Sequence, residues 1–434
     1  MQRRLILRGA GASAAALTAG SSLTACGTGG GGEMELSDEP VELRLTWWGS
    51  DTRAELTEQA IAAFEAEHAN ITVKGEFKDW SGYWDALATT TAADDSPDVL
   101  QMDEQYLASY GSRGALLDLG TAGEFLSTDG IEPSVLETGR LDGVQYAMPI
   151  GVAVLSCVVN QDLFDQYGVS LPDGNTWTWD DYAALAASLT EASGGAINGS
   201  GLSGSDNGSI RYWSRLHGGE LFGEDSKVVL DPQTLAAQWE YWLDMIASGA
   251  CESAAQMVEG MNAGIGGDGM STGKIAMGFL FNTQITAMRE ASGANMQLVK
   301  MPGSGEVDAN YFKPSMYWSV SSQSEHPAEA ALFVDFLVNS TAAADIIGTE
   351  RGIPSNTAAL EHITADLAES DRLAVEYMNS VTPGPPAVVT PKGGSELEPI
   401  LRRNAQQVYF GEAEPLAAAE SFVEELQGEI DAAK

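Results

Sequence analysis

The sequence predicts an α/β protein built on an open, mainly parallel sheet. Short runs rich in β-branched and aromatic residues alternate along the chain with longer stretches whose apolar residues recur at helical spacing. This alternation is typical of parallel sheets covered by helices. With 434 residues, of which 44% are hydrophobic, the chain can also bury two or three sizeable cores.

The first predicted elements form a β-α-β-α-β unit. Strands with apolar alternation or apolar runs are expected at 41–48, 71–77 and 97–102. Helices with periodic apolar residues are expected between them, at 54–68 and 84–93. Open parallel sheets bind ligands at the carboxyl ends of their strands. The segments that follow these ends, 48–53, 80–83 and 103–106, are therefore expected to lie together.

The same alternation continues through the rest of the chain. A further strand is predicted at 275–281, and the stretch 143–149 with the apolar run 152–159 is predicted to be a crossover. Further helices are predicted at 163–167, 179–189, 235–248 and 328–337. Thr178 and Asp181 form a variant of the capping box at the second of these helices, and Pro327 enters the last. The Gly/Ser/Asn-rich stretch 194–208 is expected to be a loop.

The charge of the chain excludes several classes of partner. It contains 22 Lys and Arg residues against 62 Asp and Glu residues, a formal net charge of −40. A field this negative repels phosphate backbones and anionic headgroups, so we expect no nucleic-acid partner and no electrostatic docking on a membrane. The acids are spread along the chain, as on a solvated surface.

The first residues indicate export and a lipid anchor. A basic start and a small-residue apolar stretch lead to Leu23-Thr24-Ala25-Cys26, which resembles the lipobox of bacterial lipoproteins. We expect 1–25 to be a signal peptide, Cys26 to be lipidated, and 26–39 to be a flexible tether. The protein would then be held at the outer face of the cytoplasmic membrane. The arginines near the start leave Sec and Tat export both open.

The remaining cysteines and the histidines indicate no cofactor. Cys157 and Cys251 lie far apart in sequence among apolar or small residues, which favours two buried free thiols, with a disulfide as the alternative. The four histidines are isolated and show no metal-ligand spacing. We expect no metal site.

A series of short motifs follows the lipobox in a characteristic order: Trp47-Trp48-Gly49, 74–77 with 82–84, Pro97-Asp98-Val99, 143–149 before Asn160, 273–278, 319–337 and Gly352-Ile353-Pro354-Ser355. Each motif is weak by itself, but together they resemble the family 1 extracellular solute-binding proteins, which deliver sugars to ABC importers. The resemblance covers nearly the whole chain beyond the signal peptide.

This resemblance implies a two-lobed periplasmic-binding-protein-like (type II) fold with a hinge of three crossovers. On that pattern the first α/β lobe is 40–149 plus 301–350, and the second is 150–300 plus 351–434. The implied ligand is a mono- or oligosaccharide held between the lobes, and the implied partners are ABC permease subunits. We expect a monomer with no catalytic residues.

Sugar chemistry indicates which residues could bind. A pyranose has apolar faces and a rim of hydroxyls, so it needs aromatic platforms and bidentate polar groups. The predicted first-lobe contacts are Trp48 and Trp80 as platforms, Asp51, Asp103 and Glu104 as hydroxyl acceptors, and Tyr317 with Trp318. The contacts that the resemblance implies in the second lobe are Arg211, Trp213, Phe281 and Asn282. Core packing is the alternative for each aromatic residue.

Alternation along a strand separates two of these tryptophans. Trp47 and Trp48 point to opposite faces, so we favour Trp48 as a platform and Trp47 as core. Trp239 and Trp242 share one helix face and are expected to pack in the protein interior.

Three of the few arginines in the chain could bind the carboxylate of an acidic sugar. Arg53, Arg211 and Arg351 would suit a uronide if two of them reached the site, because bidentate arginines match carboxylates. The alternative is that they pair with the many carboxylates of the protein itself.

Enzymatic functions are weaker interpretations. A surface-anchored glycoside hydrolase would need two carboxylates flanking the sugar, yet Asp103 and Glu104 are adjacent and point apart on a strand end. The G-x-S-x-G match at 269–273 precedes a strand, and the G-x-G-x-x-G match at 264–269 follows none. A saccharide sensor or adhesin that works without transport is a further alternative.

Overall fold

A five-stranded sheet forms the base of what we call the first lobe. The computed structural model describes residues 34–303 and 309–433. The sheet has the order β2-β1-β3-β13-β6, with β1 parallel to β2 and β3, and β13 antiparallel to β3 and β6. Its strands are β1 (Val41–Trp48), β2 (Ile71–Lys78), β3 (Val99–Met102), β6 (Met148–Pro149) and β13 (Tyr317–Val320). The β-α-β-α-β prediction is confirmed.

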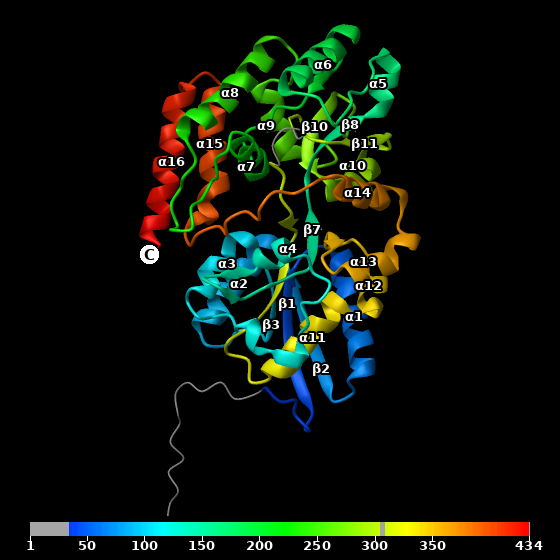
Figure 1. The fold of residues 1–434 in the computed structure, drawn as a ribbon, viewed down its shortest axis with the longest axis vertical. Helices are drawn as coiled ribbons and strands as arrows, with labels where there is room; N and C mark the ends of the chain where they lie inside the picture. The colour runs from blue at the N-terminus through cyan, green and yellow to red at the C-terminus, as the bar shows by residue number, and fades with distance from the viewer. Residues whose placement is uncertain (1–33, 304–308, 434) are drawn as a thin grey trace, which may run out of the picture. The chain divides into compact units, whose positions relative to one another are not determined.

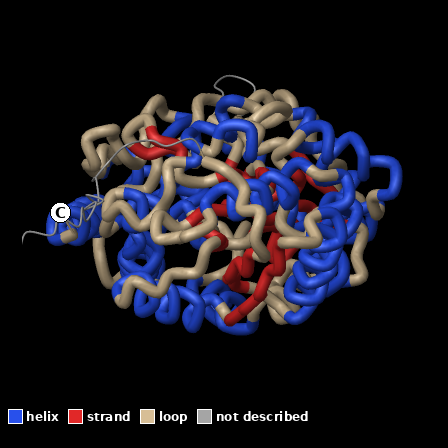
Figure 2. Tube along the Cα trace, turned by 90° about the horizontal axis from the view of Figure 1, so that it is seen from below, coloured by secondary structure: helices blue, strands red, loops and turns tan. Residues whose placement is uncertain are grey.

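Helices surround this sheet (Figures 1 and 2). They are α1 (Asp51–Glu67), α2 (Trp80–Ala92), α3 (Glu104–Gly111), α4 (Pro133–Glu137), α11 (Pro327–Asn339), α12 (Thr341–Ile347) and α13 (Thr357–Ile363). The hairpin of β4 (Arg140–Leu141) and β5 (Val144–Gln145) follows α4. Short 3₁₀ helices lie in the same lobe at η1 (Leu119–Thr121), η2 (Gly123–Phe125) and η4 (Thr364–Asp366).

A four-stranded sheet forms the base of the second lobe, in the order β11-β8-β10-β9. Its strands are β8 (Leu155–Asn160), β9 (Asn198–Ser200), β10 (Ile275–Phe281) and β11 (Met296–Val299). Its helices are α5 (Gln161–Tyr167), α6 (Trp179–Ala192), α7 (Asn207–Leu216), α8 (Pro232–Ala247), α9 (Ala254–Ala263), α10 (Ile285–Ser292), α14 (Glu369–Ser380), α15 (Leu397–Tyr409) and α16 (Pro415–Ala432), with η3 (Asn282–Gln284) and η5 (Gly394–Glu396).

A third, small sheet marks where the chain crosses between the lobes. It has the order β12-β7-β14, from β7 (Gly151–Ala153), β12 (Lys313–Pro314) and β14 (Ile353–Pro354). β7 connects β6 to β8, β12 lies between β11 and β13, and β14 lies between α12 and α14. The predicted two-lobed α/β fold is confirmed. The exact lobe boundaries given above stay a prediction.

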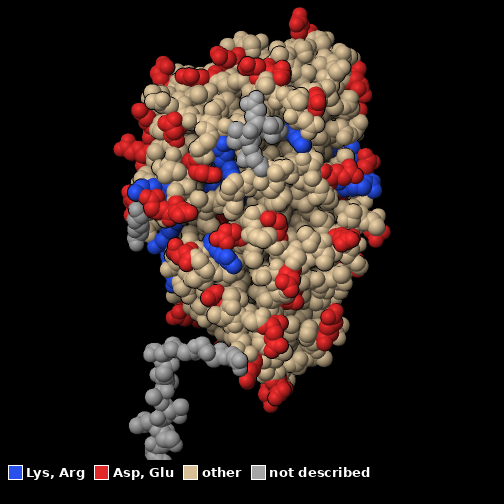
Figure 3. All heavy atoms as spheres, viewed as in Figure 1, with Lys and Arg blue, Asp and Glu red and all other residues tan. Residues whose placement is uncertain are grey.

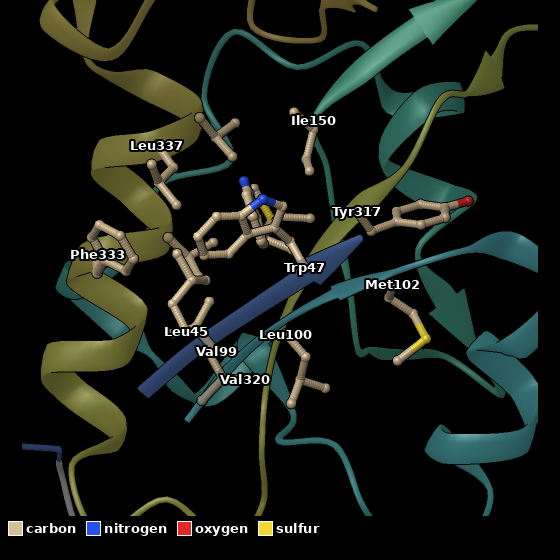
Figure 4. Close-up of a cluster of buried hydrophobic side chains, with 14 of the residues drawn as sticks. Leu45, Trp47, Val99, Leu100, Met102, Ile150, Tyr317, Val320, Phe333 and Leu337 are labelled. Carbon is tan, nitrogen blue, oxygen red and sulfur yellow. The ribbon is translucent and has the colours of Figure 1, made fainter. Parts of the chain in front are cut away.

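The first-lobe core is built around the alternate residues of β1. Trp47 is completely buried and lies among the apolar side chains of α11 and of the neighbouring strands (Figure 4). Leu45 and Val99, on adjacent parallel strands, are buried in the same cluster. The prediction that Trp47 is a core residue is confirmed, as is the packing role of Trp239 and Trp242, which are completely buried in the second lobe.

Two segments have more structure than the sequence indicated. The expected loop 194–208 contains β9 and the start of α7, because β9 gains a partner in β10 that is distant in sequence. The apolar run 152–159, predicted as part of a crossover, contains β7 and β8, which are separated by Val154 and belong to different sheets. Local pattern does not reveal which sheet a residue joins.

Cys157 and Cys251 are both buried and free, which confirms the expectation of two buried thiols. The predicted capping box of Thr178 and Asp181 is also present.

The expected signal peptide, Cys26 and the tether up to residue 33 lie outside the described residues. At the far end of the expected tether, the backbone N–H of Ser37 donates to Glu329 Oε1 at 2.6 Å.

Within residues 34–303 and 309–433, no single helix is long and apolar enough to cross a membrane. The pair α11 and α12 meets the length and composition requirements together but is bent by 63°.

The close approach of β7 to β14 yields a first prediction. A Cβ added at Gly151 would lie 2.4 Å from the carbonyl oxygen of Arg351, which belongs to the backbone and cannot rotate away. Gly151→Ala should therefore destabilise the protein by about 1–3 kcal/mol, as overpacking does. Thermal unfolding would show this as a lower melting temperature.

The matched control is Gly266→Ala. A Cβ at Gly266 would meet no atom within 4 Å, so its effect should stay within about 0.5 kcal/mol. Equal melting temperatures for the two variants would contradict the role given to this contact.

Candidate functional site

The parallel strands of the first lobe bring three chain segments to one edge of the sheet. β1 ends at Trp48, α2 begins at Trp80 just after β2, and Asp103 follows β3. The ring centroids of Trp48 and Trp80 are 5.1 Å apart, and those of Trp80 and Tyr106 are 6.1 Å apart. The three strand ends therefore converge, as their order along the chain predicts.

The aromatic residues at this edge have unequal exposure. Trp48 is 8% exposed and is packed against Trp80, Tyr83 and Trp84. Trp80, in contrast, is 40% exposed. The sequence predicted both Trp48 and Trp80 as platforms; in the structure Trp80 presents the accessible ring, and Trp48 is packed against it.

Side chains at the same edge cap the helices that follow the strands. Ser50 caps α1, Asp79 caps α2, and Asp103 caps α3 by accepting from the N–H of Gln105 at 2.9 Å. Asp51, in the first turn of α1, is exposed. Helix N-termini carry a partial positive charge, so these carboxylates also satisfy local electrostatics.

Two of the predicted arginines are engaged inside the first lobe. Arg53 Nε lies 2.8 Å from Glu350 Oε1, and its Nη1 donates to the carbonyl of Trp48 at 3.1 Å. Arg351 is 1% exposed and donates to Thr57 Oγ1 at 2.7 Å and to Gln101 Oε1 at 3.4 Å. Both side chains therefore fix protein groups instead of facing solvent.

Hydrogen bonds through Asn207 connect the two lobes. Glu104 of α3 accepts from Asn207 Nδ2 at 3.4 Å, and Arg211 Nε donates to Asn207 Oδ1 at 2.8 Å. Lys313 Nζ lies 3.9 Å from Glu104 Oε1 and 5.7 Å from the ring centroid of Phe281. The first lobe thus contributes a carboxylate, the second lobe an amide and a guanidinium, and the crossing strand β12 an ammonium group.

Burial and neighbouring charges shift the pKa values of the ionisable groups at this junction. The pKa of Asp103 is raised to about 6, because burial and the neighbouring Glu104 raise it more than Lys313 and the N–H of Gln105 lower it. Burial and the nearby Asp206 raise the pKa of Glu398, whose carboxylate accepts from the N–H of Asn207. Burial lowers the pKa of Lys313, but Glu104 and Asp103 outweigh it, so the net direction is upward.

Acidic side chains also dominate the surface. On the face shown in Figure 3 they occur from one end to the other and outnumber the basic ones. A ligand approaching the site therefore meets a negative field.

Arg211, which is 2% exposed, and four other predicted contacts lie in the packed interior. Asn282 is completely buried, with Oδ1 accepting from Val154 N at 2.7 Å and Nδ2 donating to the Ala374 carbonyl. The remaining three are Tyr317 (1% exposed), Trp318 (0%) and Trp213 (7%). Their side chains contact protein atoms and are not accessible to a ligand, so these residues are not part of the proposed site.

Other residues at the junction were not singled out from the sequence. They are Asn207, Lys313 and Glu398, whereas Tyr106 belongs to the segment 103–106 that was expected at this edge. Asn207 follows Asp206, whose position before a helix is a recognisable N-cap signal. Lys313 carries no local signal, because its partner Glu104 is distant in sequence.

The motifs suggestive of enzymes have structural roles. Ser271 of the G-x-S-x-G match donates to Met288 Sδ at 2.9 Å and precedes β10, so the strand-to-helix turn of a nucleophile elbow is absent there. His362 pairs with Asp345 at 2.8 Å, and His217 Nδ1 lies 2.8 Å from the Trp213 carbonyl oxygen. In 34–303 and 309–433, no group of three His, Cys, Asp or Glu residues could hold a metal ion.

Comparison with known families identifies the chain. The family model for the bacterial extracellular solute-binding protein matches residues 59–373, which is more than half of the chain and includes parts of both lobes. The chain belongs to the bacterial extracellular solute-binding protein family. Membership implies that this solute-binding protein is exported, and the members of the family bind ligands.

Curated relatives are more distant. A candidate binding protein of Brucella abortus is 30% identical to the solute-binding protein over 179 residues, 39% of this chain and 41% of that relative. The chain thus spans about two fifths of the length of that relative. An uncharacterised lipoprotein of Streptomyces antibioticus is 25% identical over 350 residues, 75% of this chain and 73% of its own.

Solved structures share the fold. A family 1 extracellular solute-binding protein from Alicyclobacillus acidocaldarius is 25% identical, with a TM-score of 0.71 over 90% of this chain and 99% of its own. An oligogalacturonide-binding protein of Yersinia enterocolitica, in complex with saturated digalacturonic acid, is 22% identical (TM-score 0.77; 91% and 99%). A Streptomyces glaucescens receptor solved with acarbose is 20% identical (TM-score 0.71; 92% and 100%).

The raised pKa of Asp103 predicts a pH dependence of stability. Its folded-state value, about 6, lies above the ordinary 3.8, so the folded protein binds more protons between these pH values. Stability contributed by this group is therefore full below about pH 4 and is lost as the pH rises through about 6. At pH 7 the loss amounts to about 3 kcal/mol at most.

Asp103→Asn tests this, because Asn caps helices as well as Asp does. The melting temperature of the variant should rise relative to that of the wild type between pH 4 and pH 7. Asp79→Asn, at an exposed cap on the same edge, should show a smaller change. A difference for Asp103→Asn that does not vary with pH would contradict the assignment.

Proposed function

We propose that this chain is a lipid-anchored extracytoplasmic protein that binds a carbohydrate between its lobes and delivers it to the permease subunits of an ABC transporter. One observation carries the proposal: an exposed tryptophan, Trp80, lies at the same sheet edge as Asp103 and Glu104, where the second lobe supplies Asn207. Aromatic rings and paired polar groups are what a sugar requires.

Each part of the proposed site has a distinct task. The ring of Trp80 stacks on an apolar sugar face, while Trp48 and Tyr106 hold that ring in place. Asp103 and Glu104 accept hydrogen bonds from hydroxyl groups, and Lys313 donates to them. Phe281, partly buried beneath Lys313, extends the apolar surface. The known sugar ligands of the Yersinia and Streptomyces proteins with this fold support the ligand class.

The arginines favour a neutral sugar over a uronide. Arg53 is paired with Glu350, Arg351 is buried against Thr57, and Arg211 donates to Asn207 and Thr390. A carboxylate of the ligand would have to compete with these partners in a negative field. We therefore propose an uncharged saccharide.

Binding is proposed to favour the closed arrangement of the lobes. A sugar that contacts Trp80 on one lobe and Phe281 on the other interacts with both lobes only when they are close together. It therefore binds the closed state better and shifts the equilibrium toward it. The closed form is the one proposed to dock on the permease.

Anchoring is proposed from the sequence alone. The lipobox at Leu23-Thr24-Ala25-Cys26 would attach acyl chains at Cys26, with the following residues as a tether. The lipoprotein of Streptomyces antibioticus supports this proposal by its name.

The first experiment is a thermal-shift panel with neutral mono- and oligosaccharides, uronides, amino acids and peptides. A ligand that binds only the folded protein raises its melting temperature. We expect shifts with neutral saccharides and unchanged sugar after long incubation. A shift with peptides or amino acids alone would contradict the ligand class, and released hydrolysis products would favour the glycosidase alternative.

Trp80→Ala should weaken binding of any sugar found. Loss of one stacking ring costs about 1.4 kcal/mol, or a tenfold increase in Kd. Isothermal titration calorimetry measures this directly. Phe410→Ala removes a ring of similar exposure, 50%, at the end of α15 and should leave Kd unchanged. Equal effects of the two substitutions would remove the basis for Trp80 as the platform.

A further inference from the structure

A buried arginine lies where the chain crosses between the lobes. Arg351 comes just before β14, and its carbonyl accepts a hydrogen bond from Ser315 Oγ, directly after β12. The N–H of Ser315 donates in turn to the carbonyl of Gly151, the first residue of β7, at 2.9 Å. The backbone of Arg351 therefore lies beside all three strands of the crossing sheet. Hinge motions are absorbed by a few residues at element ends of this kind.

The side chain of Arg351 extends from the crossing sheet into the first lobe. It is 1% exposed, its Nη2 donates to Thr57 Oγ1 at 2.7 Å, and its Nε donates to Gln101 Oε1 at 3.4 Å. Its Cζ lies 5.3 Å from the ring centroid of Trp318. A buried charge is costly to leave without partners, so these contacts hold the guanidinium in one orientation.

Gln101 connects this guanidinium to the end of β1. Its side chain is completely buried, and while Oε1 accepts from Arg351, Nε2 donates to the carbonyl of Trp48 at 3.5 Å. The ring of Trp48 is packed edge-on against that of Trp80, with an angle of 89° between their planes. One amide thus joins the crossing sheet to the residue that supports the exposed ring.

A second route reaches the same carbonyl from α1. Arg53 Nη1 donates to the Trp48 carbonyl at 3.1 Å, and its Nε pairs with both carboxylate oxygens of Glu350, at 2.8 and 3.0 Å. Glu350 Oε2 also lies 3.6 Å from Arg351 Nη1. The absence of a side chain at Gly49 leaves room for Arg53, because an added Cβ would lie 2.4 Å from its Cδ. The Trp48 carbonyl is therefore held from two directions by residues that contact Arg351.

We propose that Arg351 and Gln101 are positioning residues, which couple the hinge to the sugar platform by fixing the Trp48 carbonyl and so the orientation of the Trp80 ring. Rotation of the crossing strands moves the backbone of Arg351, and its side chain carries this movement to Trp48, because buried polar groups cannot give up their partners without cost. The closed hinge then presents the Trp80 ring to the sugar. The inference rests on the proposed function and deepens it.

A double-mutant cycle measures this coupling, because it separates an effect that passes through Trp80 from a general loss of structure. Gln101→Met removes both hydrogen bonds of the amide and keeps a side chain of similar length. Residues 34–434, which form one compact unit, carry Gln101→Met, Trp80→Ala or both. Calorimetry gives the Kd of each for the neutral saccharide that shifts the wild-type melting temperature most.

Gln145→Met is the matched control. Gln145 is also buried in the first lobe, accepts from Arg140 Nε at 3.0 Å and donates to the Ala147 carbonyl at 2.7 Å. It makes the same kind of bridge, from an arginine to a backbone carbonyl, but in the β4–β5 hairpin. Both glutamine substitutions should lower the melting temperature, and only one of them should act on the platform.

Gln101→Met should raise Kd about fivefold in the wild-type background and less than about twofold beside Trp80→Ala, because the ring that the contact positions is then absent. Gln145→Met should change Kd less than about twofold in both backgrounds. Arg351→Lys, which keeps the charge but loses the planar fork, tests the hinge end of the link and should show the same coupling. Gln101→Met leaves the arginine in place and decides the question even where the lysine variant does not fold.

An unchanged Kd for Gln101→Met, or an equal increase with and without Trp80, would overturn the coupling while leaving sugar binding intact. A wild-type protein that binds no saccharide would instead overturn the proposed function, and this inference with it.

Discussion

The parallel pairing of β1 with β2 and β3 is the constraint on which the rest of the site depends. β1 pairs with β2 residue by residue, from Val41 opposite Ile71 to Trp48 opposite Lys78. Parallel strands end at the same edge, so the helix starts that follow them are delivered there together. A slip of one residue would exchange the faces of Trp47 and Trp48 and place the core indole in solvent.

The small number of basic residues limits the site's ability to bind an acidic ligand. The chain has 22 basic residues against 62 acidic ones, and several of the basic ones are buried. A buried cation is costly unless it is paired, and Arg53, Arg211 and Lys313 each have protein partners. These cations therefore bind the protein's own backbone, the two lobes and the segment 388–390. Little free positive charge is left for an acidic ligand. The preference for neutral sugar follows from this use of the few basic residues.

The sequence predicted the strands and helices of the first lobe and the convergence of their ends, because these depend on local periodicity and chain order. It did not predict which aromatic ring is accessible. Tyr317 and Trp318 were expected at the site, but β13 lies inside the sheet between β3 and β6, with packing on both faces, so both are buried. Asn282 was expected to bind a ligand, yet it bonds to the backbone of Val154 and Ala374.

Long-range partners explain the residues that were missed. Lys313 follows 304–308 and has no periodic pattern around it, and its significance arises only from Glu104 on the other side of the junction. Asn207 belongs to a stretch whose composition indicated a loop, whereas its amide connects Glu104 to Arg211. Such contacts depend on how two sheets meet, which the pattern of either sheet alone does not specify.

A sugar that bridges the two lobes should hold them closed. Small-angle X-ray scattering of residues 34–434, with and without a saturating oligosaccharide found by the panel, tests this proposal. The radius of gyration should be smaller with the sugar bound, because binding selects the closed arrangement. A bound sugar that leaves the scattering curve unchanged would contradict it.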